Sequence, residues 1–302
     1  MADLAKRWGV DQFTNGMIGT TQRIGSIKRR VSACALLASA NPGNSLTWGD
    51  FGAPIKSPLH RLLMMTILSR LMTVNSSRSR LFEENQRFAN MIPAGAMVLD
   101  AGAGDAPYKS LVSHAVYESA DFEKVDKPYA KSTYVCDLAD IPVEANRYDF
   151  VLFNQVMEHL PEPKAVLKEL FRVLKPGGKI IYTAPLFYEE HEQPYDFYRY
   201  TQFAIKYLFT EAGFTLERLD WLEGYYGTVA YQMNGMATHL PSTPAEITPG
   251  LLGVALAPLM YLLRFQMGLL SVFFHRLEMR SKFMKRGYPK NYVAVFSKPA
   301  QT

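Results

Sequence analysis

The most informative segment of the chain places two glycines directly after a short apolar run, in Val98-Leu99-Asp100-Ala101-Gly102-Ala103-Gly104-Asp105. Glycines in this position let the backbone approach a ligand closely, because no Cβ obstructs it. A dinucleotide-binding loop would read GxGxxG, but Pro107 stands at the third glycine position. The Asp100 carboxylate would also repel a pyrophosphate. The segment therefore favours a ligand with a cationic group, and a tight turn that binds nothing is the alternative.

Two further acidic residues end expected strands. Asp121 lies 17 residues beyond Gly104, where a carboxylate can accept hydrogen bonds from both hydroxyls of a ribose. Asp137 and Leu138 end the next strand and suit an adenine amino group and the apolar face of its ring. In register with the glycine segment, these residues are expected to bind a ribose and an adenine. For Asp121 alone, a solvated loop acid is the alternative.

The candidate general bases are His159 and His191. His159 follows the fourth expected strand, and His191 lies in the aromatic-rich loop after the fifth. Asp196 in the same loop can orient His191 or pair with Arg199. We favour His191 as the base, with His159 and Asp196 as the other catalytic candidates. The alternatives are a structural His159 and an Asp196–Arg199 pair that only holds the loop. The candidates for contact with a substrate are Tyr195, Arg199 and Tyr200.

Strands and helices alternate through the part of the chain that carries these residues. Apolar runs predict strands over residues 97–100, 115–121, 134–136, 148–153, 179–184, 214–222 and 291–297. Apolar side chains at helical spacing predict helices over 163–174 and from Thr201 to Gly213. Such alternation implies a parallel sheet with helices on both faces.

The sheet is expected to be one of several parts of the chain. Apolar spacing predicts helices near residues 62–71 and 79–91, ahead of the first strand. The expected parts are a loosely structured arm (1–57), a helical extension (58–92), the sheet domain (93–224 and 288–299) and a hydrophobic helical insertion before the last strand (225–287).

The insertion contains a long apolar stretch. Leu251–Phe274 is 24 residues with a single charge, Arg264. That is long enough to cross a bilayer, but one crossing would leave Asn291–Ser297 on the far side of the membrane from the sheet. We therefore expect a helical hairpin with a bend near Pro258 or Gly268, or a helix lying along a surface, which roofs the substrate site. Its basic flank favours an interfacial membrane contact or a substrate lid over a buried helix pair or a dimer face.

Charge and cysteine content narrow the function classes. The net charge is +5, but residues 1–90 carry 12 basic and 5 acidic side chains, 91–240 carry 13 and 21, and 241–302 carry 8 and 2. The two basic ends would be drawn to phosphate-rich surfaces. Two cysteines without CxxC spacing exclude a disulfide scaffold and a zinc ribbon, and we expect no metal ligands. A reducing, cytoplasmic location is expected, at the inner face of a membrane if the insertion contacts lipid.

The order and spacing of several short motifs resemble one large family, the class I S-adenosylmethionine-dependent methyltransferases of the small-molecule "type 11" group. The matching pieces are Val98–Gly104, Asp121, Asp137, Tyr148–Val151, Asn154–Leu160, Val173–Gly178 and Glu211–Phe214. The resemblance implies a Rossmann-like α/β fold with a seven-stranded, mostly parallel sheet and an antiparallel last strand. It also implies S-adenosylmethionine in the Gly102–Gly104 loop, with Asn154 and Gln155 flanking the cofactor.

The expected function follows from this resemblance. We expect methyl transfer to a small or lipid-linked acceptor, to oxygen rather than carbon. The His191 loop is similar to one found in some members that resemble sugar or lipid-linked glycan methyltransferases. The alternatives are a nicotinamide-dependent oxidoreductase and a non-catalytic, membrane-peripheral binding module. Nucleic acid is not an expected partner, since no base-reading motif is visible and no (N/D)PP(Y/F) sequence follows the fourth strand.

Overall fold

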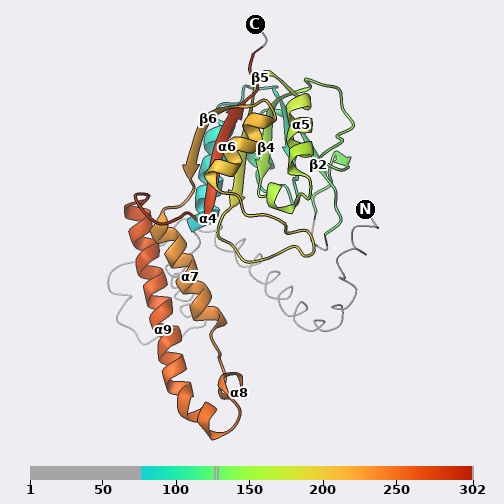
Figure 1. Cartoon of the computed structure of the whole chain (residues 1–302). Coiled ribbons are helices and arrows are strands. Elements are labelled where there is room, and N and C mark those ends of the chain that lie inside the picture. Colours follow the sequence, from blue (N-terminus) through green and yellow to red (C-terminus); the bar gives the residue numbers. More distant parts are fainter. Residues whose placement is uncertain (1–75, 126, 128, 301–302) are drawn as a thin grey trace, which may run out of the picture. The chain divides into compact units, whose positions relative to one another are not determined.

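The computed structural model describes residues 76–125, 127 and 129–300 (Figure 1). The expected arm, 1–57, and the expected helix near residues 62–71 lie outside the described residues. The first described helix, α4 (Ser76–Ala89), corresponds to the expected helix over 79–91.

Seven strands form one sheet in the order β3-β2-β1-β4-β5-β7-β6. β1 pairs in parallel with β2 and β4, and β4 pairs in parallel with β5. β7 runs antiparallel to both of its neighbours, β5 and β6, which confirms the expected topology. The strands are β1 (Met97–Ala101), β2 (Val116–Asp121), β3 (Tyr134–Val135), β4 (Tyr148–Asn154), β5 (Leu174–Pro185), β6 (Thr215–Trp221) and β7 (Asn291–Ser297).

Helices cover both faces of the sheet, because successive strand side chains point to opposite sides. On one face, buried residues of β1 and β4 such as Leu99 and Phe153 pack with α5 (Pro163–Val173) and α6 (Gln202–Glu211). On the other face, the neighbouring residues Val98 and Leu152 pack with α4 and the short helix η2 (Lys109–Val112). The Thr201 hydroxyl caps α6 by accepting a hydrogen bond from the backbone N–H of Ala204 at 3.3 Å.

One strand begins earlier than the sequence predicts. Residues 175–178 were expected to be a turn before the strand, but β5 starts at Leu174, which pairs with Tyr148 of β4. The register shifts after this pair, so the lysine–proline–glycine–glycine segment is an irregular part of the strand. The backbones of Gly177 and Gly178 are held by Lys298, through hydrogen bonds of 2.8 and 2.9 Å. The pairing with the chain beyond β7, which local composition does not reveal, extends the strand.

The insertion is a hairpin of two helices, α7 (Tyr225–His239) and α9 (Leu251–Arg280), joined through the short α8 (Pro244–Ile247) (Figure 1). The expected bend at Pro258 or Gly268 is wrong, because α9 continues through both residues. The chain reverses instead between α7 and α9. Pro258 lies in the third turn of α9, where its missing N–H removes one helical hydrogen bond without ending the helix.

A buried carboxylate joins the two helices of the hairpin. Glu278 near the end of α9 accepts hydrogen bonds from the backbone N–H groups of Gly224 (2.8 Å) and Gly227 (3.2 Å) at the start of α7. Amide groups at a helix N-terminus have no partner within the helix and favour negative charge, so Glu278 holds this end of α7. Burial raises the pKa of the Glu278 carboxyl.

Most of the apolar surface of α9 remains uncovered. Among the described residues, α9 is the single helix long and apolar enough to cross a membrane, and 11% of its most apolar stretch is buried. β7 follows α9 and pairs between β5 and β6, so the chain returns to the sheet after this helix. The exposed large apolar side chains of α9 include Leu251, Leu259, Leu262, Phe265, Leu269 and Phe273.

Candidate active site

The expected cofactor residues gather where parallel strands end, around the point at which the chain order of the sheet reverses between β1 and β4. Gly102, directly after β1, has a φ of +77°. A Cβ at this position would lie 2.4 Å from a methyl carbon of Val156, which follows β4. A residue with a side chain would therefore strain the backbone and displace Val156, so this turn requires glycine.

Gly104 lies in a more open place. Its φ is +54°, and a Cβ built there would have no neighbouring atom within 4 Å. Its N–H donates a hydrogen bond to Oδ2 of Asp121 at 2.9 Å, while Oδ1 of Asp121 accepts from the N–H of Glu123 at 3.0 Å. The acid at the end of β2 thus fixes the glycine turn at the end of β1. The open space beside Gly104 leaves room for a ligand at this turn.

Asp100 is almost fully buried in β1, with 3% of its surface exposed. Its Oδ2 accepts a hydrogen bond from the Tyr117 hydroxyl at 2.8 Å. Burial raises the pKa of the Asp100 carboxyl to about 7, and the nearby Asp121 charge adds to this rise, although the Tyr117 hydrogen bond opposes it. A carboxyl with this pKa gains from a cationic ligand, which would restore its ionised form near neutral pH.

Of the remaining expected cofactor residues, one acid is exposed to solvent, and two amide side chains form hydrogen bonds within the protein. Asp137 after β3 is exposed and accepts a hydrogen bond from the N–H of Ala139, and Leu138 is buried beside it. Asn154 exchanges two side-chain hydrogen bonds with Asn85 of α4, at 2.9 and 3.1 Å. Gln155 has a φ of +55° and donates to the Thr183 hydroxyl at 3.2 Å. Asn154 and Gln155 therefore hold β4 to its neighbours at the cofactor edge.

The loop after β5 is anchored to the short helix η3 (Met157–His159), which follows β4. The backbone carbonyl of Glu158 accepts hydrogen bonds from the N–H groups of Phe197 (2.8 Å) and Tyr198 (3.2 Å). The His159 ring donates to the carbonyl of Tyr195 at 2.6 Å. These contacts bring the two sequence-predicted histidines together, although they are 32 residues apart.

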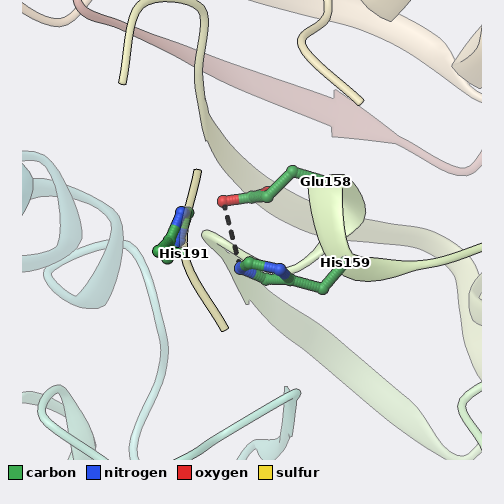
Figure 2. A group of neighbouring side chains, drawn as sticks. All are labelled: Glu158, His159 and His191. Carbon is green, nitrogen blue, oxygen red and sulfur yellow. Dashed lines mark ion pairs between the residues drawn. The ribbon is translucent and has the colours of Figure 1, made fainter. Parts of the chain in front are cut away.

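Figure 2 shows the resulting group of three side chains, Glu158, His159 and His191. The rings of His159 and His191 meet edge to face with centroids 4.7 Å apart, and Nε2 of His159 lies 3.8 Å from Oε1 of Glu158. Burial raises the pKa of the Glu158 carboxyl to about 8. Burial also lowers the pKa of His159, so its ring favours the neutral form.

The hydrogen bonds of the two histidines fix which nitrogen carries the proton. Nδ1 of His159 faces the carbonyl of Tyr195, and Nδ1 of His191 faces the carbonyl of Glu189 at 3.1 Å. A carbonyl oxygen can only accept a hydrogen bond, so Nδ1 is the protonated nitrogen in each ring. In the neutral form of each ring, Nε2 is therefore the nitrogen that can accept a proton or bind a cation.

Asp196 and Arg199 form the pair that the sequence offered as one alternative. Arg199 binds both carboxylate oxygens of Asp196, at 2.6 and 2.8 Å, and donates to the carbonyl of Glu189 at 3.1 Å. The Arg199 hydrogen bonds lower the pKa of Asp196 to about 2. Asp196 also accepts from the His191 backbone N–H at 2.9 Å and lies 3.4 Å from Nδ1 of its ring. Asp196 thus pairs with Arg199 and contacts His191 at once.

Tyr195 and Tyr200 occupy different surroundings in the same loop. The Tyr195 ring packs edge to face on Phe122, which follows β2, with centroids 5.4 Å apart. Tyr200 is buried, and its hydroxyl donates to the carbonyl of Met157 at 3.3 Å. Tyr195 therefore lies between the cofactor edge and the histidines, while the Tyr200 hydroxyl holds the loop to η3.

A pocket of about 500 Å³ opens between this loop and α7. Tyr188 connects the pocket to the histidines, because its ring packs edge to face on His191 with centroids 5.0 Å apart. Nζ of the buried Lys290 lies 4.6 Å from the Tyr188 ring and 3.9 Å from the Tyr231 ring. The residues that give the pocket its mixed aromatic and polar character are Phe187, Tyr188, Glu189, Tyr231, Gln232 and His239.

Sequence reasoning did not single out Glu158, Tyr188 or Tyr231. Glu158 lies inside the Asn154–Leu160 motif and directly precedes His159. Its position beside a candidate base is the sequence signal that could have identified it. No local pattern marks Tyr231, because α7 reaches the loop only through the tertiary fold.

Comparison with known proteins gives a family match. Residues 75–219 match a family model described as a methyltransferase domain. A tRNA (carboxymethyluridine(34)-5-O)-methyltransferase of Arabidopsis thaliana is 27% identical over 116 residues, which cover 36% of this chain and 29% of that protein. A ubiquinone biosynthesis O-methyltransferase of Coxiella burnetii is 28% identical over 127 residues, which cover 38% of this chain and 52% of that protein.

The chain thus spans about half or less of the length of these curated relatives. Among solved structures, the Haemonchus contortus phosphoethanolamine N-methyltransferase 2 in complex with S-adenosyl-L-methionine has a TM-score of 0.43 at 14% identity. That match covers 72% of this chain and 53% of the other.

Proposed function

Because this chain contains a class I S-adenosylmethionine-dependent methyltransferase domain, we propose that it transfers a methyl group from this cofactor to an oxygen atom of a small or lipid-linked acceptor. The observation that carries the proposal is the meeting of two features at one edge of the sheet. An open glycine turn beside a buried carboxyl follows β1, and two histidine rings meet at the same edge, His159 after β4 and His191 after β5. Val156 connects them, since it contacts Gly102 and directly precedes η3.

The cofactor is proposed to lie along the ends of β1, β2 and β3. In this arrangement Asp100 and the glycine turn face a cationic part of the cofactor, Asp121 binds the ribose, and Asp137 and Leu138 contact the adenine. Gly104 N–H now occupies one oxygen of Asp121, so ribose binding would share or replace that hydrogen bond.

The acceptor is proposed to occupy the pocket beside Tyr188, with its nucleophilic hydroxyl near His191. Methyl transfer from a sulfonium is an in-line displacement, so alignment of the reacting atoms supplies much of the rate, on the order of 7–11 kcal/mol. A hydroxyl must also lose its proton, and a positioned base contributes roughly 10²–10⁴-fold. Nε2 of His191 is the proposed base, with Asp196 orienting the ring and His159 packed against it. Tyr195 and Arg199 are proposed to shape the acceptor side of this site.

The test is methyl incorporation from labelled S-adenosylmethionine into lipid extracts and sugar nucleotides. We expect a labelled product whose methyl group is on oxygen. Incorporation into carbon would refute the oxygen assignment. Cofactor binding without turnover of any acceptor would favour the non-catalytic alternative, and hydride transfer with a nicotinamide cofactor is set aside by the family match. The same assay should also include tRNA as an acceptor, because the name of one relative states a tRNA substrate.

The pH dependence of cofactor affinity tests the role of Asp100. Because the pKa of the Asp100 carboxyl is about 7 in the free protein, this carboxyl is mostly protonated at lower pH. A cationic ligand must then displace the proton in order to bind, which weakens binding at low pH. We expect affinity for S-adenosylmethionine, measured by calorimetry, to fall about tenfold from pH 8 to pH 6, as the ionised fraction does. Asp100→Asn should bind weakly at both pH values. An unchanged affinity across this range would contradict a direct charge contact.

The same group affects the stability of the free protein with a defined sign. Because burial raises the Asp100 pKa above its ordinary value of 3.8, the folded state binds the proton more tightly than the unfolded state. The free energy of unfolding should therefore decrease as the pH rises from about 4 to about 7. Asp100→Asn should remove this contribution.

The exposed face of α9 is proposed to contact a membrane, which would bring a lipid-linked acceptor to the pocket beside α7. The observation that supports this is the row of exposed apolar side chains followed by an exposed basic cluster, which suits an anionic lipid surface. The basic residues are Arg276, Arg280, Lys282, Lys285 and Arg286.

A pair of substitutions on α9 tests this contact. Phe265 and Leu269 are one helical turn apart, and 63% and 55% of their surfaces are exposed. We expect the double variant Phe265→Glu/Leu269→Glu to reduce cosedimentation with phosphatidylglycerol vesicles at least about tenfold, since burial of each side chain contributes roughly 1.5–3 kcal/mol. The matched control is Phe203→Glu/Tyr207→Glu, also one turn apart and exposed, on α6. Equal loss in both pairs, or no vesicle binding by the unaltered chain, would contradict the proposal.

A further inference from the structure

Glu158 differs from the other buried glutamates of the described residues in the hydrogen bonding of its side chain. The residue is 0% exposed, and neither carboxylate oxygen has a hydrogen-bond partner among the described residues. By contrast, Glu278 accepts two backbone hydrogen bonds, and Glu223 accepts two from Asn291, at 2.8 and 3.0 Å. An unsatisfied buried carboxylate is costly, so these two oxygens indicate a missing partner.

The groups that face Glu158 cannot supply that partner. Figure 2 shows the carboxylate directed toward the His159 and His191 rings. Each ring carries a proton on Nδ1, where a backbone carbonyl accepts the hydrogen bond, so in its neutral form Nε2 has no proton. With the carboxylate ionised and both rings neutral, the cluster therefore consists of hydrogen-bond acceptors alone. A protonated carboxyl does not resolve this, because the 3.8 Å between Oε1 of Glu158 and Nε2 of His159 is too long for a hydrogen bond.

The three side chains are close enough for one ion to bind all of them after small shifts. Zinc binds imidazole nitrogen and carboxylate oxygen at about 2.0–2.2 Å, and tetrahedral geometry puts two ligand atoms of one ion roughly 3.3–3.6 Å apart. The 3.8 Å between Glu158 and His159 is slightly longer than this range. One ligand atom from each residue lies within 4.8 Å of the others. The widest gap would thus have to close by at most about 1.5 Å, through a side-chain rotation and a small shift of the His191 loop.

From these contacts we propose that Glu158, His159 and His191 form a binding site for a divalent transition-metal ion such as Zn²⁺. Two imidazoles and one carboxylate suit zinc and similar ions, whereas Ca²⁺ and Mg²⁺ prefer oxygen ligands. The carbonyls of Tyr195 and Glu189 hold the far nitrogen of each ring, as outer partners commonly do at metal-binding histidines. Three protein ligands leave a coordination position open.

This inference rests on the proposed function in one respect, the place of the acceptor. His191 contacts Tyr188, which lines the pocket, so the open position of the ion would be available to an acceptor hydroxyl. A bound divalent ion lowers the pKa of a hydroxyl that it binds. With an ion bound, Nε2 of His191 would be a metal ligand instead of the base, and the acceptor hydroxyl would lose its proton to solvent. The sequence analysis expected no metal ligands, and the three residues of the proposed site come from two distant segments of the chain.

The experiment measures zinc binding to the full, untagged chain by equilibrium dialysis with metal analysis, with Co²⁺ absorption as a second readout. We expect one tightly bound zinc ion per chain. Glu158→Gln and His191→Ala should each weaken binding at least about tenfold, in line with the loss of one ligand. Because Glu158 is buried and its variant could misfold, His191→Ala in the partly exposed loop keeps the test informative. The matched control is Glu190→Gln, which changes an exposed acid next to His191 and should leave zinc binding unchanged.

Methyl transfer by the same preparations separates this inference from the proposed function. No zinc binding by the unaltered chain, or equal binding by all variants, would overturn the metal site. Full methyl transfer after removal of zinc by a chelator would also overturn it, while the proposed function would stand. Tight zinc binding that depends on Glu158 and His191, without transfer to any acceptor, would support the site and refute the proposed function.

Discussion

Replacing Gly104 by valine is expected to abolish the binding of S-adenosylmethionine while leaving the fold largely intact. Apart from the adjacent residues, no protein atom lies within 4 Å of a Cβ built at this position, so the Cβ itself displaces nothing in the protein. It would instead occupy the place proposed for the cofactor. The expected loss of affinity is about 100-fold or more, which corresponds to roughly 3 kcal/mol, measured by calorimetry.

A second glycine offers a matched control for the backbone strain of this substitution. Gly95, in the turn before β1, has a φ of +78° and is likewise free of neighbours within 4 Å of a built Cβ. Gly95→Val should therefore cost a similar amount of stability, about 1–2 kcal/mol for a left-handed backbone, without affecting the cofactor. If both variants lose the same affinity, strain rather than contact is responsible, and the cofactor does not lie beside Gly104.

The sequence predicted the sheet well because its signals are local. Apolar runs marked all seven strands, and the last strand, Asn291–Ser297, was predicted with the observed bounds. The early start of β5 at Leu174 was missed, since it depends on pairing with Tyr148 and on Lys298, far along the chain. The local sequence of residues 175–178 predicts a turn, because it contains two adjacent glycines.

The position of the turn in the hairpin and the contacts of the histidine cluster could not be predicted from such local signals. An apolar stretch that must return to the sheet predicts a reversal, but Pro258 does not fix its position, because a helix can continue past proline when its packing on a neighbouring helix is retained. Likewise, His159 and His191 could be chosen as candidate bases from their residue type alone. That they face each other and a buried Glu158 depends on hydrogen bonds between η3 and a loop 36 to 40 residues later, which no pattern in either segment encodes.

Replacing His191 by alanine is expected to lower kcat for methyl transfer about 10²–10⁴-fold, the range for loss of a positioned base. The affinity for S-adenosylmethionine should stay unchanged, because His191 lies on the acceptor side of the site, beside Tyr188. The two quantities are measured separately, by single-turnover kinetics with saturating cofactor and by calorimetry. Loss of a ligand for a bound ion would have the same effect on kcat, and the chelator experiment distinguishes these two roles.

The control for this prediction is Glu190→Gln in the same loop. Glu190 is exposed and adjacent to His191, so its replacement tests whether any change in this loop impairs the reaction. We expect near-unaltered kcat in this variant. A His191→Ala enzyme with full kcat would remove both proposed roles of the residue. The acceptor would then have to be a group that needs no base, such as a phenol or a carbon acid, and alignment beside the glycine turn would account for the rate.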